Sequence, residues 1–291
     1  MKAIWKRELT SLFHNVIAWL FLGVTLFLFG LYFFVYNLSY GYPYIAYSLS
    51  AISFIFLITV PVLTMRVLAE ERRARTDQLL LTSPVSVGKI VFGKFLALAT
   101  IYTISVLVIC IAPVVLLLFG EIPVLETYVA IFGFWLYGLA CIAIGEFVSS
   151  LTENQVISAV ITFALLFVGY MMQSITGLIS SSGNLLTRIL GFYDLLSPLE
   201  DLMSGSFSLT AVVYYLSLIG LCLFLTTQVI QKRRWTVSRK KISLSVFSVG
   251  TVAAGMAIVV ALNAGMAMLT ETWPSFDVTE KKLYYIKGDT R

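Results

Sequence analysis

The chain has few charged residues, and this scarcity defines its broad class. Charged residues make up 12% of the 291 residues, whereas hydrophobic residues make up 59%. An ordinary soluble domain carries about 25% charged residues. The mean hydropathy of +0.93 points in the same direction. With so much apolar surface and so little charge, the chain must be an integral membrane protein.

Cysteine and histidine are also scarce, which argues against several kinds of chemistry. Cys110, Cys141 and Cys222 all fall in apolar stretches, where we expect packing residues rather than disulfides or metal ligands. His14 stands alone, and acid–base catalysis would need an oriented partner. Glu146 is the only clearly intramembrane ionisable residue, so an intramembrane enzyme is the least supported class of function. We expect Glu146 to snorkel or to pair with a basic group, in preference to a substrate or proton role.

Long apolar stretches, in contrast, are abundant. About 20 apolar residues in a helix cross the roughly 30 Å hydrocarbon layer, and a helix satisfies its own backbone polar groups. Seven stretches qualify, at 16–36, 45–64, 92–119, 127–149, 156–179, 211–230 and 242–269. The sequence therefore predicts an all-α integral membrane protein. The expected divisions are an interfacial helix at 1–15, a six-helix domain at 16–230, a cytosolic basic loop at 231–241, a seventh helix at 242–269 and an extracellular tail at 270–291.

Lysine and arginine are distributed unequally between the two ends of these spans. They concentrate in the N-terminus, in residues 65–95 and in residues 231–241, which all fall on one side. Cationic loops are retained in the cytoplasm, so the N-terminus is expected inside and the C-terminus outside. The sequence pI of about 9.0 reflects this asymmetry. Membrane lipid is thus the expected partner of the basic loops, and nucleic acid is not.

The N-terminal residues have the pattern of an amphipathic helix. Lys2, Lys6 and Arg7 lie off its apolar face, and this pattern predicts a helix in the inner interface. A simple extension of the first span is the alternative. The apolar face consists of Met1, Ile4, Trp5, Leu9, Leu12 and Phe13.

Residues 65–95 form a charge-dense segment between two apolar stretches. Good helix formers and charge pairs predict a helix over 67–81, which Ser83 and Pro84 end. A second short helix from Val85 is expected to lead into the third span. The charges could simply solvate a loop, but the adjacent Leu79–Leu81 run favours a docking surface for a soluble partner.

One motif in this segment resembles a phosphate-binding loop but lacks its chemistry. GKIVFGKF, at 88–95, places Phe95 where serine or threonine would hold magnesium, and no βαβ unit surrounds it. We therefore expect that the chain does not bind ATP itself.

Residues 70–95, EERRARTDQLLLTSPVSVGKIVFGKF, resemble the segment after the second span of ABC-2 type transporter permeases, the membrane subunits of ATP-driven exporters. There an EER-x-x-x-T-x-x-x-L-L-x-S-P-V run precedes a glycine–lysine pair. GEFVSSLTENQVISAV, at 145–160, resembles the inner turn between their fourth and fifth spans. Residues 193–216 resemble their outer segment, especially in the gliding-motility branch. The resemblance covers about the first 230 residues.

This resemblance implies a six-helix ABC-2 (type V exporter-like) transmembrane domain with a cytosolic coupling helix at 66–90. It implies a multi-pass permease of the bacterial plasma membrane that dimerises with an identical or homologous half. Separate ATPase subunits would bind ATP and Mg, leaving this chain with no cofactor of its own. The expected ATPase-facing surface consists of Glu70, Glu71, Arg72, Arg73, Arg75 and Asp77.

Two outer features go beyond the six-helix pattern. Residues 185–196 are expected to form a short helix dipping toward the membrane, as a candidate gate. In the seventh span, small residues every four positions predict a ridge for close helix docking. These residues are Ala253, Ala257, Ala261 and Gly265.

The tail stretch DVTEKKLYYI, at 277–286, resembles the start of the extracellular auxiliary protein that accompanies gliding-motility-type permeases. The tail is therefore expected either to add a strand to an outer partner or to be disordered.

Two functions remain open. One is an exporter permease, and the other is a non-transporting mechanotransmission scaffold through which the ATPase acts on an extracellular partner.

Overall fold

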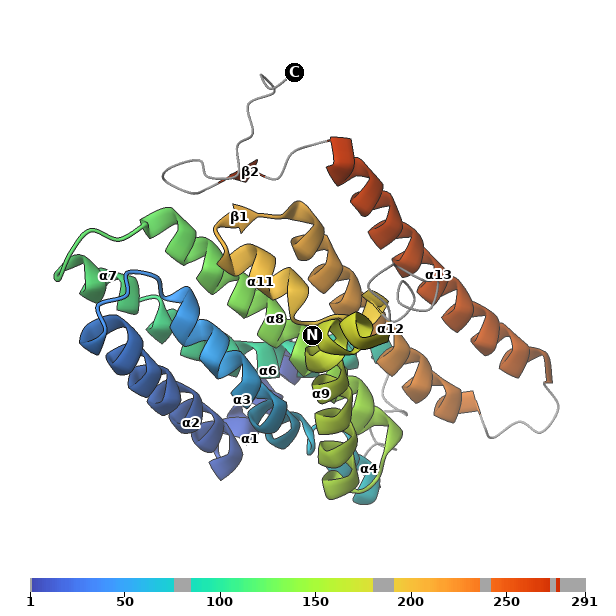
Figure 1. Ribbon diagram of the computed structural model, residues 1–291. Coiled ribbons are helices and arrows are strands. Elements are labelled where there is room, and N and C mark those ends of the chain that lie inside the picture. Colours follow the sequence, from blue (N-terminus) through green and yellow to red (C-terminus); the bar gives the residue numbers. More distant parts are fainter. Residues whose placement is uncertain (1, 76–84, 180–190, 236–241, 273–275, 278–291) are drawn as a thin grey trace.

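A computed structural model describes residues 2–75, 85–179, 191–235, 242–272 and 276–277 of the chain (Figure 1). Long helices dominate it. In chain order the elements are α1 (Lys2–Phe13), α2 (Val16–Phe33), the π-helical η1 (Phe34–Ser39), α3 (Ala46–Thr64), α4 (Ala69–Arg73), α6 (Val87–Ile109), α7 (Ala112–Leu117), α8 (Val124–Leu151), α9 (Gln155–Ile179), the short η2 (Gly191–Tyr193), α11 (Ser197–Met203), β1 (Ser206–Phe207), α12 (Leu209–Trp235), α13 (Ile242–Thr272) and β2 (Phe276–Asp277).

Helix α8 forms the centre of the bundle and contacts α3, α6, α9, α11 and α12. Its small residues allow this, because a position without a side chain lets a neighbouring helix approach closely. The Tyr102 ring of α6 occupies the space beside Gly138, and Thr64 of α3 that beside Gly145. A side-chain carbon at Gly133 would lie 2.7 Å from Leu202 Cβ of α11.

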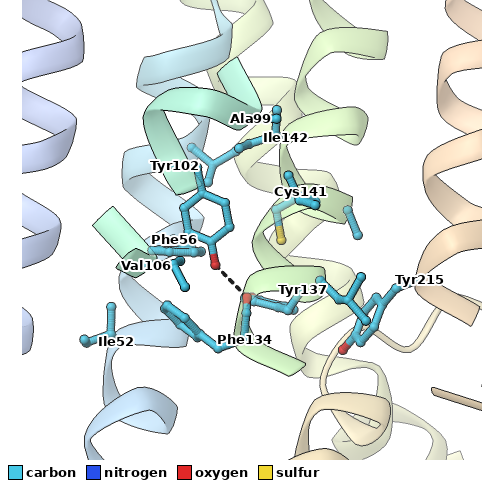
Figure 2. Close-up of a cluster of buried hydrophobic side chains, with 14 of the residues drawn as sticks. Ile52, Phe56, Ala99, Tyr102, Val106, Phe134, Tyr137, Cys141, Ile142 and Tyr215 are labelled. Atoms are coloured by element: carbon cyan, nitrogen blue, oxygen red, sulfur yellow. Dashed lines mark hydrogen bonds between the residues drawn. The ribbon is translucent and has the colours of Figure 1, made fainter. Parts of the chain in front are cut away.

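Aromatic side chains from four helices meet around α8 in the middle of the bundle (Figure 2). Phe56, Tyr102, Phe134, Tyr137 and Tyr215 are all fully buried. The Tyr102 hydroxyl donates to the Phe134 carbonyl at 2.6 Å, and the Tyr137 hydroxyl donates to the Ser53 carbonyl at 3.3 Å. Buried hydroxyls that bond to backbone carbonyls fix the relative heights of the helices.

Six of the described helices are long and apolar enough to cross a membrane. They correspond to the first six expected spans, which confirms the all-α membrane fold, although their bounds differ. The expected span at 92–119 begins earlier, at Val87, and its α-helix ends at Ile109 before the short α7. The seventh, α13, contains a described apolar part at Gly250–Met266.

Helix α13 runs along the edge of the bundle beside α12 (Figure 1). β1 and β2 pair antiparallel, with Ser206 opposite Asp277 and Phe207 opposite Phe276. Residues 276–277, which follow α13, thus pair with the connection between α9 and α12, which we call the outer connection.

Candidate functional site

The segment after α3 turns back against the bundle through a serine of α8. Ser149 Oγ accepts hydrogen bonds from the Leu68 and Ala69 amides, both at 3.1 Å, and donates to the Met65 carbonyl at 3.3 Å. The first amides of a helix have no partner within the helix, so this hydroxyl supplies one. Ser149 is fully buried, and it therefore fixes α4 firmly to the inner end of α8.

Charged side chains of α1, α4 and α6 meet beside this contact. Lys94 is fully buried, and its ammonium nitrogen lies 2.9 Å from Glu71 Oε1 and 3.2 Å from Glu8 Oε2. It also donates to the Val67 carbonyl at 3.1 Å. The Arg7 guanidinium lies 2.6 Å from Glu8 and 3.5 Å from Glu71. Two cations and two carboxylates thus join three helices, and we call Arg7, Glu8, Glu71 and Lys94 the inner charge cluster.

The cluster holds Glu8 in its ionised form. Burial opposes ionisation of this carboxyl, but the charge of Lys94 and hydrogen bonds from Arg7 and Lys94 outweigh burial and lower the pKa of Glu8. The hydrogen bond to Glu8 raises the pKa of Arg7 against the effect of its own burial. A lysine buried inside a membrane protein is costly unless it is paired, and here two carboxylates neutralise it.

Helix α1 reaches this cluster because its apolar face packs on α6. The Trp5 indole donates to Thr100 Oγ1 at 3.1 Å. A side-chain carbon at Gly93 would lie 3.0 Å from Ile4 Cγ2, so the glycine allows the close approach. The amphipathic pattern therefore identifies a face that packs on the protein.

A second ion pair ties α4 to the turn between α8 and α9. Arg72 Nε lies 2.9 Å from Glu153 Oε1, and Arg72 Nη1 donates to the Leu151 carbonyl at 2.7 Å. Together with Ser149 and Lys94, this pair connects α4 to both inner ends of α8 and α9.

Five of the six residues expected on the ATPase-facing surface are described, and they separate into two groups. Glu71 and Arg72 make the internal contacts described above. Arg73 and Arg75 are exposed, and Glu70 pairs with Arg66 at 2.8 Å while its side chain stays half-exposed. Asp77 lies outside the described residues. Glu71 faces inward, where its carboxylate meets Lys94 of α6 and Arg7 of α1.

The expected helix over 67–81 is wrong in its described part, which holds only a short helix followed by a left-handed residue, and 76–81 lie outside the described residues. Helix α4 covers only Ala69–Arg73. Arg75 has a φ of 55°, a left-handed conformation that a regular helix does not contain. The second expected helix, which was to start at Val85 and lead into the third span, agrees better with the structure, because α6 starts at Val87 after Ser86. Residues 88–95 lie inside this helix, so GKIVFGKF forms no glycine-rich loop.

Glu146 differs from the expectation that it would snorkel or form an ion pair. Its side chain is fully buried on α8, and neither carboxyl oxygen has a hydrogen-bond partner among the residues described. Lys94 is already engaged by Glu8 and Glu71, which explains why no ion pair to Glu146 forms. The expectation of a pair was therefore wrong.

The outer connection also departs from its expected form. A helix was expected at 185–196, of which 185–190 lies outside the described residues. The described part contains η2 and then α11, which starts at Ser197. Asp194 accepts hydrogen bonds from the Leu196 and Ser197 amides at 3.0 and 3.1 Å, so this carboxylate sets the start of α11.

Buried contacts hold this outer connection against the bundle. The Tyr215 hydroxyl of α12 donates to the Leu195 carbonyl at 2.8 Å. The Leu195 amide donates to the Gly169 carbonyl of α9 at 3.1 Å, and Leu195 is fully buried. The connection thus links α9, α11 and α12.

The small-residue ridge of the seventh span is not the face that packs on α12. Ala253, Ala257 and Ala261 are exposed, and a side chain at Gly265 would meet no atom within 4 Å. The contacting face lies elsewhere on the helix. Its Asn263 amide donates to Ser217 at 2.8 Å, and a side chain at Gly255 would lie 2.7 Å from Phe224 Cε1. The ridge as a docking surface for another helix stays a prediction.

Sequence analysis did not single out Glu8, Lys94 or Ser149 as functional residues. Glu8 carried a usable signal, since it lies four residues from both Ile4 and Leu12 and so interrupts the apolar face of the predicted helix. A charge on that face indicates an internal partner. Lys94, inside an apolar helix, is the cation that such a carboxylate would need.

Comparison with known families identifies the region that contains most of these elements. A family model described as ABC-2 family transporter protein matches residues 33–228. The match runs from the end of α2 into α12 and covers more than half of the chain, and it confirms the resemblance found in the sequence. Comparison with individual curated proteins gives no match. Helices α1 and α13 lie outside the matched residues.

Proposed function

The chain belongs to the ABC-2 transporter family and is a multi-pass membrane permease, and from this we propose that separate ATPase subunits drive it through α4. The observation that carries the proposal is the attachment of α4. Its internal side is fixed to α6, α8 and the turn before α9, while Glu70, Arg73 and Arg75 remain on the accessible side. A short element with this arrangement can receive a force and pass it to the bundle.

The mechanism follows from these attachments. Movement of a soluble motor would displace α4, and the Glu71–Lys94 pair would transmit the displacement to α6 and to α1 through Glu8. The Arg72–Glu153 pair would transmit it to α8 and α9. Coupling between distant sites needs contiguous packed or ion-paired elements, which these contacts provide.

The remaining features of the proposal come from family membership and the distribution of charge. The permease dimerises with an identical or homologous half to form a path, and its ATPase partners bind ATP and Mg. It lies in a bacterial plasma membrane with the N-terminus and α4 in the cytoplasm. The narrower assignment to the gliding-motility-type branch rests on residues 193–216 and 277–286.

Charge reversal at the exposed arginines tests the proposal. The double variant Arg73→Glu, Arg75→Glu should bind the partner ATPase at least about tenfold more weakly, because interfacial charge pairs contribute of the order of 1.5 kcal/mol or more. Co-purification of a P-loop ATPase and its hydrolysis rate in proteoliposomes are the measurements. Glu121→Lys, an exposed reversal before α8 on the opposite side, is the matched control. Unchanged co-purification and hydrolysis in the double variant would contradict the proposal.

A mechanical function is the second candidate, and the position of α13 favours it. Asn263 bonds to Ser217 of α12, and β2 pairs with β1 next to α12. Movement of α12 could therefore reach residues outside the membrane and an extracellular auxiliary protein. Removal of the residues after Thr272 should abolish co-purification of such a protein while the ATPase is retained. Retention of both partners would exclude this candidate.

A further inference from the structure

A polar cavity lies at the inner surface between α1, the start of α2, the end of α3 and α4. Its volume is about 640 Å³, within the roughly 300–1,000 Å³ range of ligand pockets. Its charged walls are formed by Arg7, Glu8, Arg66, Glu70 and Glu71. Arg73 and Arg75, the exposed arginines at the end of α4 that are proposed to face the ATPase, do not line the cavity, whereas Glu70 of the same helix does.

The charges around this cavity are balanced and paired with one another. Three carboxylates and two guanidinium groups line it, and Lys94, which bonds Glu8 and Glu71, supplies the third cation. The six charges therefore sum to zero. A ligand with a net charge would upset this balance, whereas a ligand that carries one charge of each sign would preserve it.

The charged groups retain capacity for a ligand. The Arg66 side chain bonds Glu70 through Nε and Nη2, which leaves Nη1 free of that pair, and it is about one third exposed. The Glu70 side chain is 47% exposed and that of Arg7 is 56% exposed. A guanidinium has five donors and a carboxylate about four acceptor sites, so each can bind a ligand group without breaking its present pair.

The remaining wall is apolar and lies toward the bundle. This wall is formed by Leu12, Ile17 and Leu63, and the polar Ser11 and Asn15 lie beside it. A charged rim next to an apolar wall, at the level where an interfacial helix meets the first span, matches the division of a phospholipid into headgroup and acyl chain. A free polar metabolite would gain nothing from the apolar part.

We propose that this cavity binds the headgroup of a zwitterionic phospholipid that carries a primary ammonium group. Its phosphate lies between Arg7 and Arg66, since guanidinium groups bind phosphate oxygens through paired hydrogen bonds. Its ammonium lies against Glu70 and Glu71. A trimethylammonium headgroup has no N–H donor and binds in aromatic cages, and none of the residues that line the described cavity is aromatic.

Lipid retention by the full-length protein tests this site. The purified protein in mild detergent receives an equimolar mixture of phosphatidylethanolamine, phosphatidylcholine and phosphatidylglycerol, and native mass spectrometry counts the lipids retained. The ethanolamine lipid should be retained over both others. The double variant Arg66→Gln, Glu70→Gln removes one charge of each sign and should reduce its retention about tenfold, because charge-assisted hydrogen bonds are lost.

The control is a second double variant that leaves the net charge unchanged, at the ion pair between α4 and the turn before α9. Arg72→Gln with Glu153→Gln removes an ion pair of similar length outside the cavity and should leave the preference among lipids unchanged. Should the Arg66 and Glu70 double variant fail to fold, Glu70→Gln alone should still lose the preference for ethanolamine over choline. Equal retention of the three lipids by the unaltered protein would overturn the proposal. So would displacement of the lipid by an equal concentration of soluble glycerophosphoethanolamine, which would identify a soluble ligand.

Discussion

The Lys94 ammonium nitrogen lies 2.9 Å from Glu71 Oε1, in the interior of the protein, and joins α6 to α4. The lysine is fully buried and Glu71 is only 21% exposed. This pair connects the surface that we propose receives force to a membrane-spanning helix. We therefore expect it to contribute to stability as well as to the proposed coupling.

Lys94→Met should destabilise the protein by roughly 3 kcal/mol, because it leaves Glu8 and Glu71 without their buried cation. Thermal unfolding in detergent, followed by the reaction of a fluorogenic maleimide with the three cysteines, measures this. Lys89→Met removes an exposed lysine five residues earlier on α6 and should change little. Equal stability of the two variants would mean that the inner charge cluster does not hold α1 and α4 in place.

The pH dependence of stability should reveal how much the ionised Glu8 carboxylate contributes to it. Because its pKa is lowered in the folded protein, its contribution is complete above the unfolded value of about 4.3 and is lost as pH falls through the folded value. The difference in stability between the native protein and Glu8→Gln should thus be constant from pH 8 to pH 6 and shrink below about pH 4.3. A difference that shrinks between pH 8 and 6 would assign the effect to another group.

Glu146→Met should leave stability unchanged or raise it by about 1 kcal/mol. A buried carboxyl without hydrogen-bond partners costs free energy that an apolar side chain of similar size does not. Glu8→Met is the matched control, since it removes a paired glutamate and should destabilise the protein. A loss in Glu146→Met as large as that in Glu8→Met would show that Glu146 has a stabilising partner after all.

The two faces of α13 should respond differently to larger side chains. Gly255→Leu should separate α13 from α12, because even a Cβ at this position would lie 2.7 Å from Phe224, whereas Ala257→Leu points away from α12. Disulfide formation between cysteines placed at 217 and 263, in a chain without its native cysteines, measures the separation. Cross-linking should fall severalfold only in Gly255→Leu. A fall only in Ala257→Leu would place the small-residue ridge against α12.

Contacts that follow from a local pattern could be predicted from the sequence, whereas contacts between residues distant in the chain could not. Helical period alone indicated the apolar face of α1, and Ile4 and Trp5 do pack on α6. Period could not show that the Lys94 ammonium pairs with both Glu8 and Glu71, because these residues are 86 and 23 positions away from it. The ridge at Ala253, Ala257, Ala261 and Gly265 led to no contact with α12, since small residues permit close packing on any available partner and do not specify which.

Composition and apolar run length by themselves determined that this protein is a bundle of membrane helices, because only a continuous apolar helix satisfies both the lipid and the backbone. The local motif at 70–95 also identified its family. Tertiary structure alone decided which charges of that motif face inward, which carboxylate stays unpaired and where a mixed-charge cavity opens. Those outcomes depend on the directions of side chains from helices distant in sequence, and the energy of a buried charge depends on its neighbours in space.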